Sequence, residues 1–152
     1  MTGKKNAILF RIAAVCLIVV FIFPCPALAA PNENISTYAS DYLDSYNAYI
    51  CAMGSGKLEI WFSVTGTYYM EDIGTLKIML YESTDLTNWT WVETFLHEDY
   101  DTMLAQNDYF YASHVDYQGV AGRYYKAYVC IWAGKDDGGD TRYMWTSVEK
   151  AT

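Results

Sequence analysis

Residues 57–65 alternate between apolar and other side chains, and this period of two constrains the fold more than any other feature of the sequence. One face of the segment carries Leu58, Ile60, Phe62 and Val64. Successive side chains of a strand point to opposite faces of a sheet, so the pattern predicts a strand with one buried face. The Gly54-Ser55-Gly56 turn before it predicts a hairpin with a preceding strand over residues 46–53.

Five further segments combine turn boundaries with β-branched and aromatic residues, which favour strands. They cover residues 75–81, 89–96, 109–115, 124–133 and 142–148. Between them, residues 97–108 are acidic and irregular, with one short helical turn predicted at 102–106. We therefore expect an all-β fold: a two-sheet antiparallel sandwich of about seven strands, of the immunoglobulin or fibronectin kind. A closed barrel is the alternative, because strand period and spacing do not separate the two.

Two of these strands suggest which side chains form the core. In residues 75–81 the expected core face is Leu76, Ile78 and Leu80. In residues 124–133 the more apolar face is Tyr125, Ala127, Val129 and Ile131. That choice turns Cys130 outward. A Tyr two residues before a Cys, as in Tyr128 and Cys130, resembles the tyrosine corner of immunoglobulin domains, but with this core face the corner role falls to Tyr125.

Residues 1–29 have the form of a secretory signal peptide. Lys4 and Lys5 precede an apolar run over residues 12–23, and Ala27-Leu28-Ala29 gives an A-x-A cleavage signature. The run has 12 residues, short of the roughly 20 that span a bilayer. We expect a polar lead-in over residues 30–45, a domain over 46–152, secretion, and no membrane span after cleavage.

Removal of the first 29 residues leaves an acidic domain with 7 basic and 18 acidic side chains, a net charge of −11. This charge argues against binding to a nucleic-acid backbone, which requires a basic face. Cys51 and Cys130 remain, and an even pair in an exported protein predicts one disulfide. A two-cysteine metal site is the rival, but it would need His97 and His114, which have no zinc-finger spacing.

Several motifs together resemble a known family. They are Ile73-Gly74-x-Leu76-x-Ile78-x-Leu80, then Trp89 or Trp91, then Gly122-x-Tyr124-Tyr125-x-Ala127, and a closing Thr146-Ser147. The pattern is similar to small exported β-sandwich proteins of Gram-positive, clostridial-type bacteria, catalogued as a domain of unknown function. The similarity runs from about Gly54 to Val148. It implies export and an immunoglobulin-like fold, and it implies no activity.

Aromatic side chains opposite the expected core are the candidate binding residues. They are Trp61, Tyr128, Trp132 and Trp145, and Trp61 and Trp132 could be neighbours on one sheet. Aromatic rings combine an apolar face with a polar edge, which suits sugars and protein partners. The alternative is that these rings serve strand propensity and are covered by a second layer. We expect a non-catalytic exported module that binds an extracellular protein or glycan.

The sequence gives only weak indications of metal binding or catalysis. Asp136, Asp137 and Asp140 lie in a glycine-rich loop and are weak calcium candidates, because the spacing does not match an EF-hand and aspartates are common in turns. No cofactor is expected. The chain contains no G-x-S-x-G elbow, and 18 acidic residues make chance carboxylate pairs common, so we do not expect an enzyme. The alternatives are a small secreted, bacteriocin-like effector and, less favoured, a hydrolase.

Overall fold

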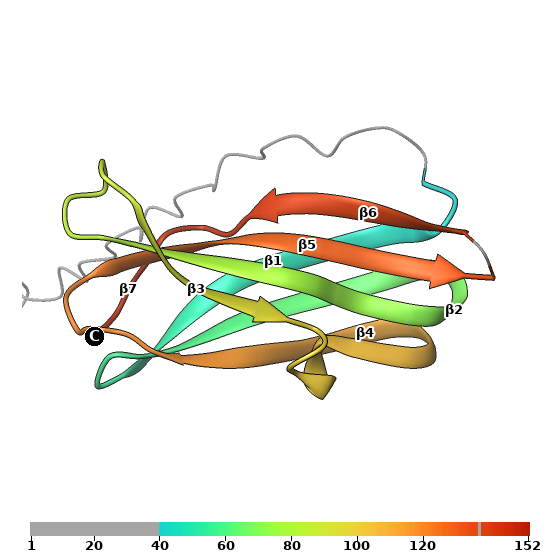
Figure 1. Cartoon of the computed structure of the whole chain (residues 1–152), viewed down its shortest axis with the longest axis horizontal. Helices are drawn as coiled ribbons and strands as arrows, with labels where there is room; N and C mark the ends of the chain where they lie inside the picture. Colours follow the sequence, from blue (N-terminus) through green and yellow to red (C-terminus); the bar gives the residue numbers. More distant parts are fainter. Residues whose placement is uncertain (1–39, 137) are drawn as a thin grey trace, which may run out of the picture. The chain divides into compact units, whose positions relative to one another are not determined.

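The computed structural model describes residues 40–136 and 138–152, which form an antiparallel, almost entirely β domain (Figure 1). Its strands are β1 (Leu43–Gly54), β2 (Lys57–Ser83), β3 (Thr90–Leu96), β4 (Leu104–Gln118), β5 (Tyr124–Lys135), β6 (Gly138–Trp145) and β7 (Glu149–Lys150). A short 3-10 turn at Asp101–Met103 precedes β4. The expected signal peptide lies outside the described residues. Within the described ranges, no helix has the length and apolarity needed to cross a membrane.

The hairpin predicted at the start of the domain is confirmed. β1 and β2 pair from Leu43 opposite Gly66 to Gly54 opposite Lys57. The turn between them places Ser55 and Gly56 at positive φ, 53° and 81°. Glycine reaches that region without a steric penalty, which explains why this turn is rich in glycine.

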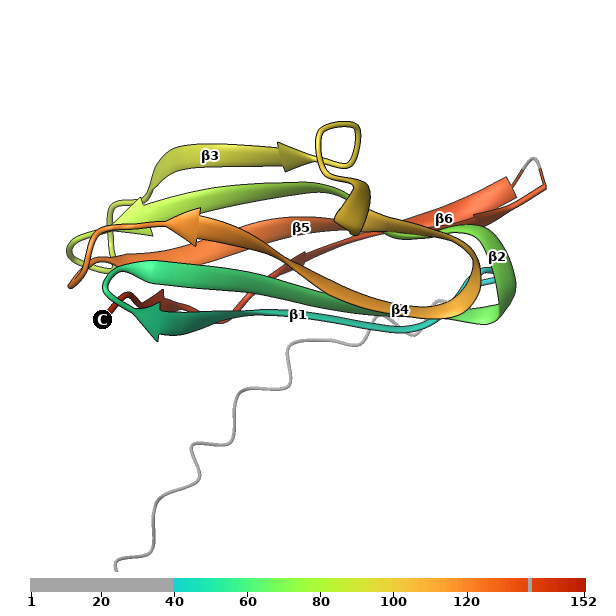
Figure 2. The same ribbon diagram turned by 90° about the horizontal axis from the view of Figure 1, so that it is seen from below.

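β2 joins two strands that the sequence predicts as separate. β4 pairs with β2 down to Thr65 opposite Phe110 and, after a register shift, resumes at Met70 opposite Asp108. The ladder therefore continues around a bend, and Figure 2 shows β2 turning back at one end of the molecule. Residues 57–66 of β2 lie between β1 and β4, which we call the first half of the sheet. Residues 72–83 lie between β3 and β5, which with β6 form the second half.

The sheet curls so that the apolar faces of its two halves enclose one core. Fully buried side chains from both halves belong to the same cluster, among them Leu58, Ile60, Phe62, Ile78, Leu80, Val129 and Ile131. The predicted core face of residues 57–65 is confirmed, as is that of residues 124–133. Burying these side chains is the main favourable contribution to folding.

The prediction that Leu76 belongs to the core is wrong. Thr75 lies opposite Ile131 and Lys77 opposite Cys130, so β2 carries one extra residue at this point. Such a bulge shifts the alternation of side chains. Thr75 is therefore fully buried and Leu76 partly exposed, whereas Ile78 and Leu80 are buried as expected.

The Tyr125 hydroxyl makes two hydrogen bonds, one with the 118–122 turn and one with β2. Its hydroxyl accepts a hydrogen bond from the backbone N–H of Val120 at 2.8 Å and donates one to Glu82 at 3.0 Å. Glu82 also pairs with Arg123. Burial of the Tyr125 ring is the main cause of the raised pKa of its phenol. These contacts hold the 118–122 turn against β2.

The predicted disulfide is wrong, because Cys51 and Cys130 are both free thiols. Cys51 lies between the core-facing positions Ile50 and Ala52 of β1, and Cys130 lies between Val129 and Ile131 of β5. Side chains alternate along a strand, so both thiols point away from the core. They lie on the outer faces of different halves of the sheet, with the core between them.

Candidate functional site

Among residues 40–136 and 138–152, the largest aromatic group lies on the outer face of the second half of the sheet. Tyr128 of β5 lies opposite Trp145 of β6, and their ring centroids are 4.8 Å apart. Tyr143 stacks on Tyr128 at 5.6 Å, and Tyr81 of β2 contacts Trp145 at 5.3 Å. We call Tyr81, Tyr128, Tyr143 and Trp145 the β5–β6 aromatic cluster. The structure thus brings together two of the predicted binding residues, Tyr128 and Trp145.

Lys126 adds a positive charge to this cluster. Its ammonium lies over the Trp89 ring at 4.3 Å from the centroid and over Trp145 at 4.6 Å. A cation over an aromatic face is attracted by the electrons of the ring. Tyr143 and Trp145 are 56% and 46% exposed, so the surface offers apolar rings, phenol hydroxyls and one cation to a ligand.

Tyr143 also covers one of the free thiols. Cys130 lies opposite Tyr143 in the β5–β6 ladder and is 5% exposed. A hydrogen bond with the Cys130 thiol is the main cause of a raised pKa for the Tyr143 phenol. The neutral form of the phenol is therefore favoured beside the thiol.

Trp61 lies elsewhere, on the outer face of the first half of the sheet. Its ring stacks between Tyr49 of β1, at 6.4 Å, and His114 of β4, at 4.4 Å. Trp132 of β5 lies opposite Gly74 of β2 and Thr141 of β6. The expectation that Trp61 and Trp132 are neighbours on one sheet is therefore wrong. The curl places the two indoles on different faces.

Trp132 packs on the backbone of the hairpin that joins β5 and β6. A Cβ atom added to Gly134 or Gly139 would collide with the Trp132 ring. The indole therefore covers bare glycine backbone, which gives it a structural role. The glycines of residues 134–139 were visible in the sequence, but their position under Trp132 depends on the β5–β6 register.

The predicted calcium residues are arranged differently from a cation cage. Asp137 lies outside the described residues. Asp140 accepts hydrogen bonds from the Ser40 hydroxyl and, at 3.2 Å, from the Tyr42 N–H. The Ser40 bond is the largest cause of a lowered pKa for Asp140. The carboxylate of Asp140 thus connects the start of β1 to β6. The backbone N–H of Asp136 donates a hydrogen bond to the Glu71 carboxylate at 3.1 Å.

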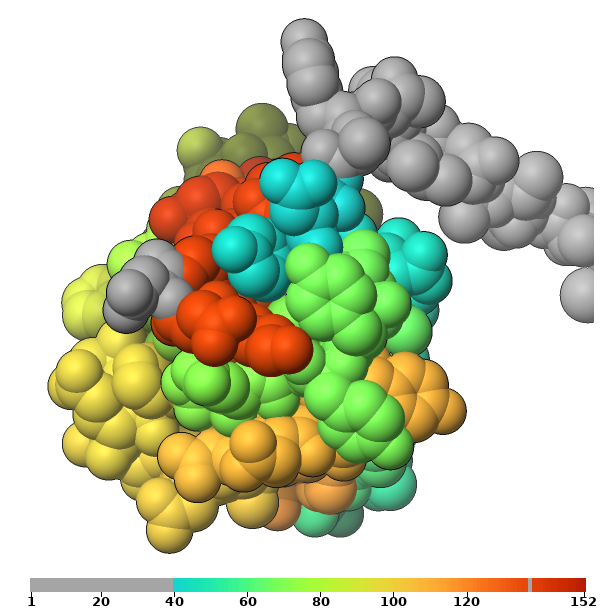
Figure 3. All heavy atoms as spheres, turned by 90° about the vertical axis from the view of Figure 1, so that its right-hand side faces the viewer, coloured from blue at the N-terminus to red at the C-terminus, as the bar shows by residue number. Residues whose placement is uncertain are grey.

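A second exposed aromatic group lies where β2 turns back, at the end of the molecule seen in Figure 3. Tyr69 of β2 packs edge-on against Tyr109 of β4, with ring centroids 5.6 Å apart. Lys135 lies 5.6 Å from the Tyr68 ring centroid. The sequence does not reveal this group, because residues 66–72 have no regular alternation and do not predict a strand.

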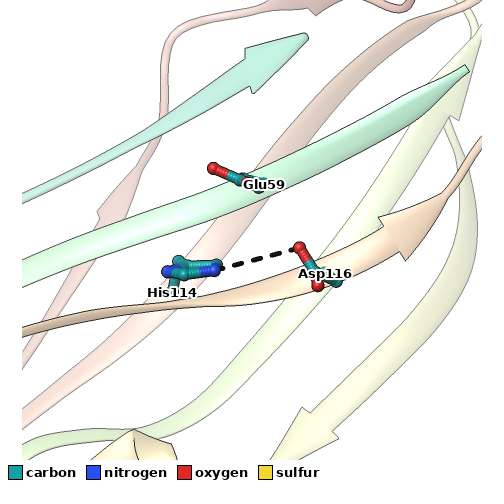
Figure 4. A group of neighbouring side chains, drawn as sticks. All are labelled: Glu59, His114 and Asp116. Atoms are coloured by element: carbon teal, nitrogen blue, oxygen red, sulfur yellow. Dashed lines mark ion pairs between the residues drawn. The ribbon is translucent and has the colours of Figure 1, made fainter. Parts of the chain in front are cut away.

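A separate cluster, shown in Figure 4, consists of side chains of types that can bind a metal ion. Glu59 of β2 and His114 and Asp116 of β4 each present a donor atom within 4.8 Å of the other two. Cross-strand pairing brings them together, since Glu59 lies opposite Asp116 and Trp61 opposite His114. The sequence did not reveal this group either. To find it from the sequence, one would need to know which strand pairs with residues 57–65.

No protein-family model and no curated protein match this sequence. Among solved structures, the sporulation control protein Spo0M from Bacillus subtilis matches with a TM-score of 0.38 and 10% identity, over 73% of this chain and 51% of that one. A family 76 glycoside hydrolase from a bovine Bacteroides thetaiotaomicron strain matches with a TM-score of 0.30 and 17% identity, over 71% of this chain and 20% of that one. The chain thus spans about half the length of the first and a fifth of the second. At these TM-scores neither likeness carries an argument about function.

Proposed function

We propose that this chain is a secreted, non-catalytic binding module of the immunoglobulin- or fibronectin-like sandwich class, related to the small exported proteins that its motifs resemble. Its ligand is an extracellular protein or glycan, and the ligand docks on the β5–β6 aromatic cluster. The signal-peptide pattern of residues 1–29 supports export. The tyrosine-corner hydrogen bonds of Tyr125 support the sandwich class.

The observation that carries the binding proposal is the exposure of aromatic rings beside a cation. Tyr143 and Trp145 remain about half exposed although they contact Tyr128. Aromatic residues are enriched at protein interfaces because a rigid ring buries a large area at a small entropic cost. Sugar rings stack on the same side chains through their apolar faces, and Lys126 can donate hydrogen bonds to hydroxyls or carboxylates.

The test is binding to a glycan array and, separately, capture of proteins from the surface of bacterial cells. Trp145→Ala and Tyr143→Ala are each expected to weaken binding at least about fivefold, because truncating a central aromatic residue of an interface costs about 1–4 kcal/mol. Tyr69→Ala is the matched control. Tyr69 is an exposed tyrosine on a different surface, and its truncation should leave the affinity unchanged.

The glycan array and the protein capture together distinguish a glycan ligand from a protein ligand. Binding on the array that both cluster variants lose would establish a glycan ligand, and loss confined to the captured protein would establish a protein ligand. Unchanged binding in Trp145→Ala and Tyr143→Ala, with all variants folded by circular dichroism, would refute the proposed surface.

A further inference from the structure

Glu59, His114 and Asp116 form a group whose ligand atoms converge on the outer face of β2 and β4. The donor atoms lie within 4.8 Å of one another, and His114 Nε2 is 3.9 Å from Asp116 Oδ1. Figure 4 shows all three side chains on the same side of the two strands. In a tetrahedral zinc site with ligand bonds of about 2.0 Å, neighbouring ligand atoms are about 3.3 Å apart. The donor atoms are thus up to about 1.5 Å farther apart than in a formed site, and the Asp116 side chain, which is 58% exposed, has room to move toward an ion.

Trp61 holds two of the three ligands in place. Its indole Nε1–H donates a hydrogen bond to Glu59 Oε2 at 3.0 Å, and its ring stacks on the His114 imidazole at 4.4 Å between centroids. Hydrogen bonds and packing around ligating side chains fix their orientation and typically change metal affinity by about 10–100-fold. β2 is internal here, between β1 and β4, whereas β4 pairs only with β2, so Glu59 lies on a central strand and His114 and Asp116 lie on an edge strand.

A cation already lies at this site in the form of the Lys57 ammonium. Its Nζ is 3.5 Å from Glu59 Oε1 and 3.3 Å from Asp116 Oδ1. The two carboxylates therefore share one positive charge that stands on a flexible side chain. A doubly charged ion would compete for the same oxygens.

We propose that Glu59, His114 and Asp116 bind a divalent transition metal of the zinc type, which displaces the Lys57 ammonium. One imidazole with two carboxylates is a donor set that suits zinc, and imidazole is a poor ligand for calcium and magnesium, which take oxygen. Three protein ligands leave a fourth position for water. This site lies on the opposite half of the sheet from the β5–β6 aromatic cluster. The metal proposal therefore does not depend on whether that cluster binds a ligand.

The test is calorimetric titration of the metal-free full chain with zinc ions. We expect one zinc per chain and a loss of affinity of at least about 100-fold in His114→Ala. The chain has two histidines, so His97→Ala is the matched control and should bind zinc as the parent does. Trp61→Phe keeps an aromatic ring on His114 but removes the hydrogen bond to Glu59, and it should weaken binding roughly tenfold.

Lys57→Gln gives the sharpest test. Removal of the competing ammonium should strengthen zinc binding roughly tenfold, whereas it would change little at a site elsewhere on the chain. Circular dichroism of each variant checks that the fold is retained. Equal affinity of His114→Ala and the parent, loss of binding in His97→Ala, or unchanged affinity in Lys57→Gln would each overturn the proposal.

Discussion

At the scale of single residues, two buried threonines show how one hydroxyl can stabilise or destabilise this fold. Thr75 is 0% exposed, and within the described part of the chain its Oγ1 has no hydrogen-bond partner. Thr146 is also buried, but its Oγ1 accepts a hydrogen bond from the backbone N–H of Ala127 at 2.9 Å. A buried hydroxyl without a partner costs about 1–3 kcal/mol.

We predict that Thr75→Val raises the free energy of unfolding by about 1 kcal/mol, because it removes an unpaired hydroxyl and keeps the β-branched shape. Thr146→Val should lower the free energy of unfolding by about 1–3 kcal/mol, because it leaves the Ala127 N–H without a partner. Urea denaturation of both variants measures the two changes. A destabilising Thr75→Val would show that the hydroxyl is satisfied in solution.

Residue-scale prediction from the sequence succeeded where the alternation of side chains is regular. The apolar face of residues 124–133 was assigned correctly, so the outward direction of Cys130 followed from pattern alone. The sequence predicts the wrong face for Leu76, because one extra residue in β2 reverses the alternation; Gly74, next to the bulge, is its one mark in the sequence, but a glycine there is equally compatible with a strand end. The group of Glu59, His114 and Asp116 was out of reach, since it depends on which strands pair.

At the scale of elements, Gly74 lets the start of β4 approach β2 closely just after the bend of β2. Gly74 has φ of 148°, and a Cβ atom there would collide with the carbonyl oxygen of Met103. The close approach lets the end of the 3-10 turn and the start of β4 pack directly on β2. The individual strand segments were predictable from alternation, but their continuity was not, because glycines at 66 and 74 resemble strand ends.

We predict that Gly74→Ala lowers the free energy of unfolding by at least about 2 kcal/mol, because the methyl group adds a backbone collision to a strained φ. Gly122→Ala is the matched control. Gly122 also has a positive φ, 88°, but a Cβ atom there meets nothing within 4 Å, so only the conformational cost of about 1 kcal/mol applies. Thermal and urea denaturation compare the two. Equal losses would mean that the close contact between Gly74 and Met103 does not constrain the packing of β4 on β2.

At the scale of the whole described domain, the curl of one continuous sheet decides which surface groups can cooperate. The halves share a core, so their outer faces point in different directions, and the aromatic residues divide between them. Trp61 stacks with Tyr49 and His114 on one face, whereas Tyr128 and Trp145 contact each other on the other. The aromatic composition indicated binding, but the sequence could not show that its residues form separate surfaces.

The same geometry separates the two thiols, and it predicts their chemistry. In the full chain carrying Cys16→Ser and Cys25→Ser, purified without reductant, a thiol reagent should find two free thiols in urea. In the folded protein the partly exposed Cys51 should react quickly, and Cys130, which is 5% exposed and covered by Tyr143, should react only as fast as the protein opens. Cys51→Ser should retain the slow thiol alone. Because a bridge between outward-facing cysteines on different halves would require the core to open, the absence of free thiols in urea would mean that the chain adopts a different register from the one described.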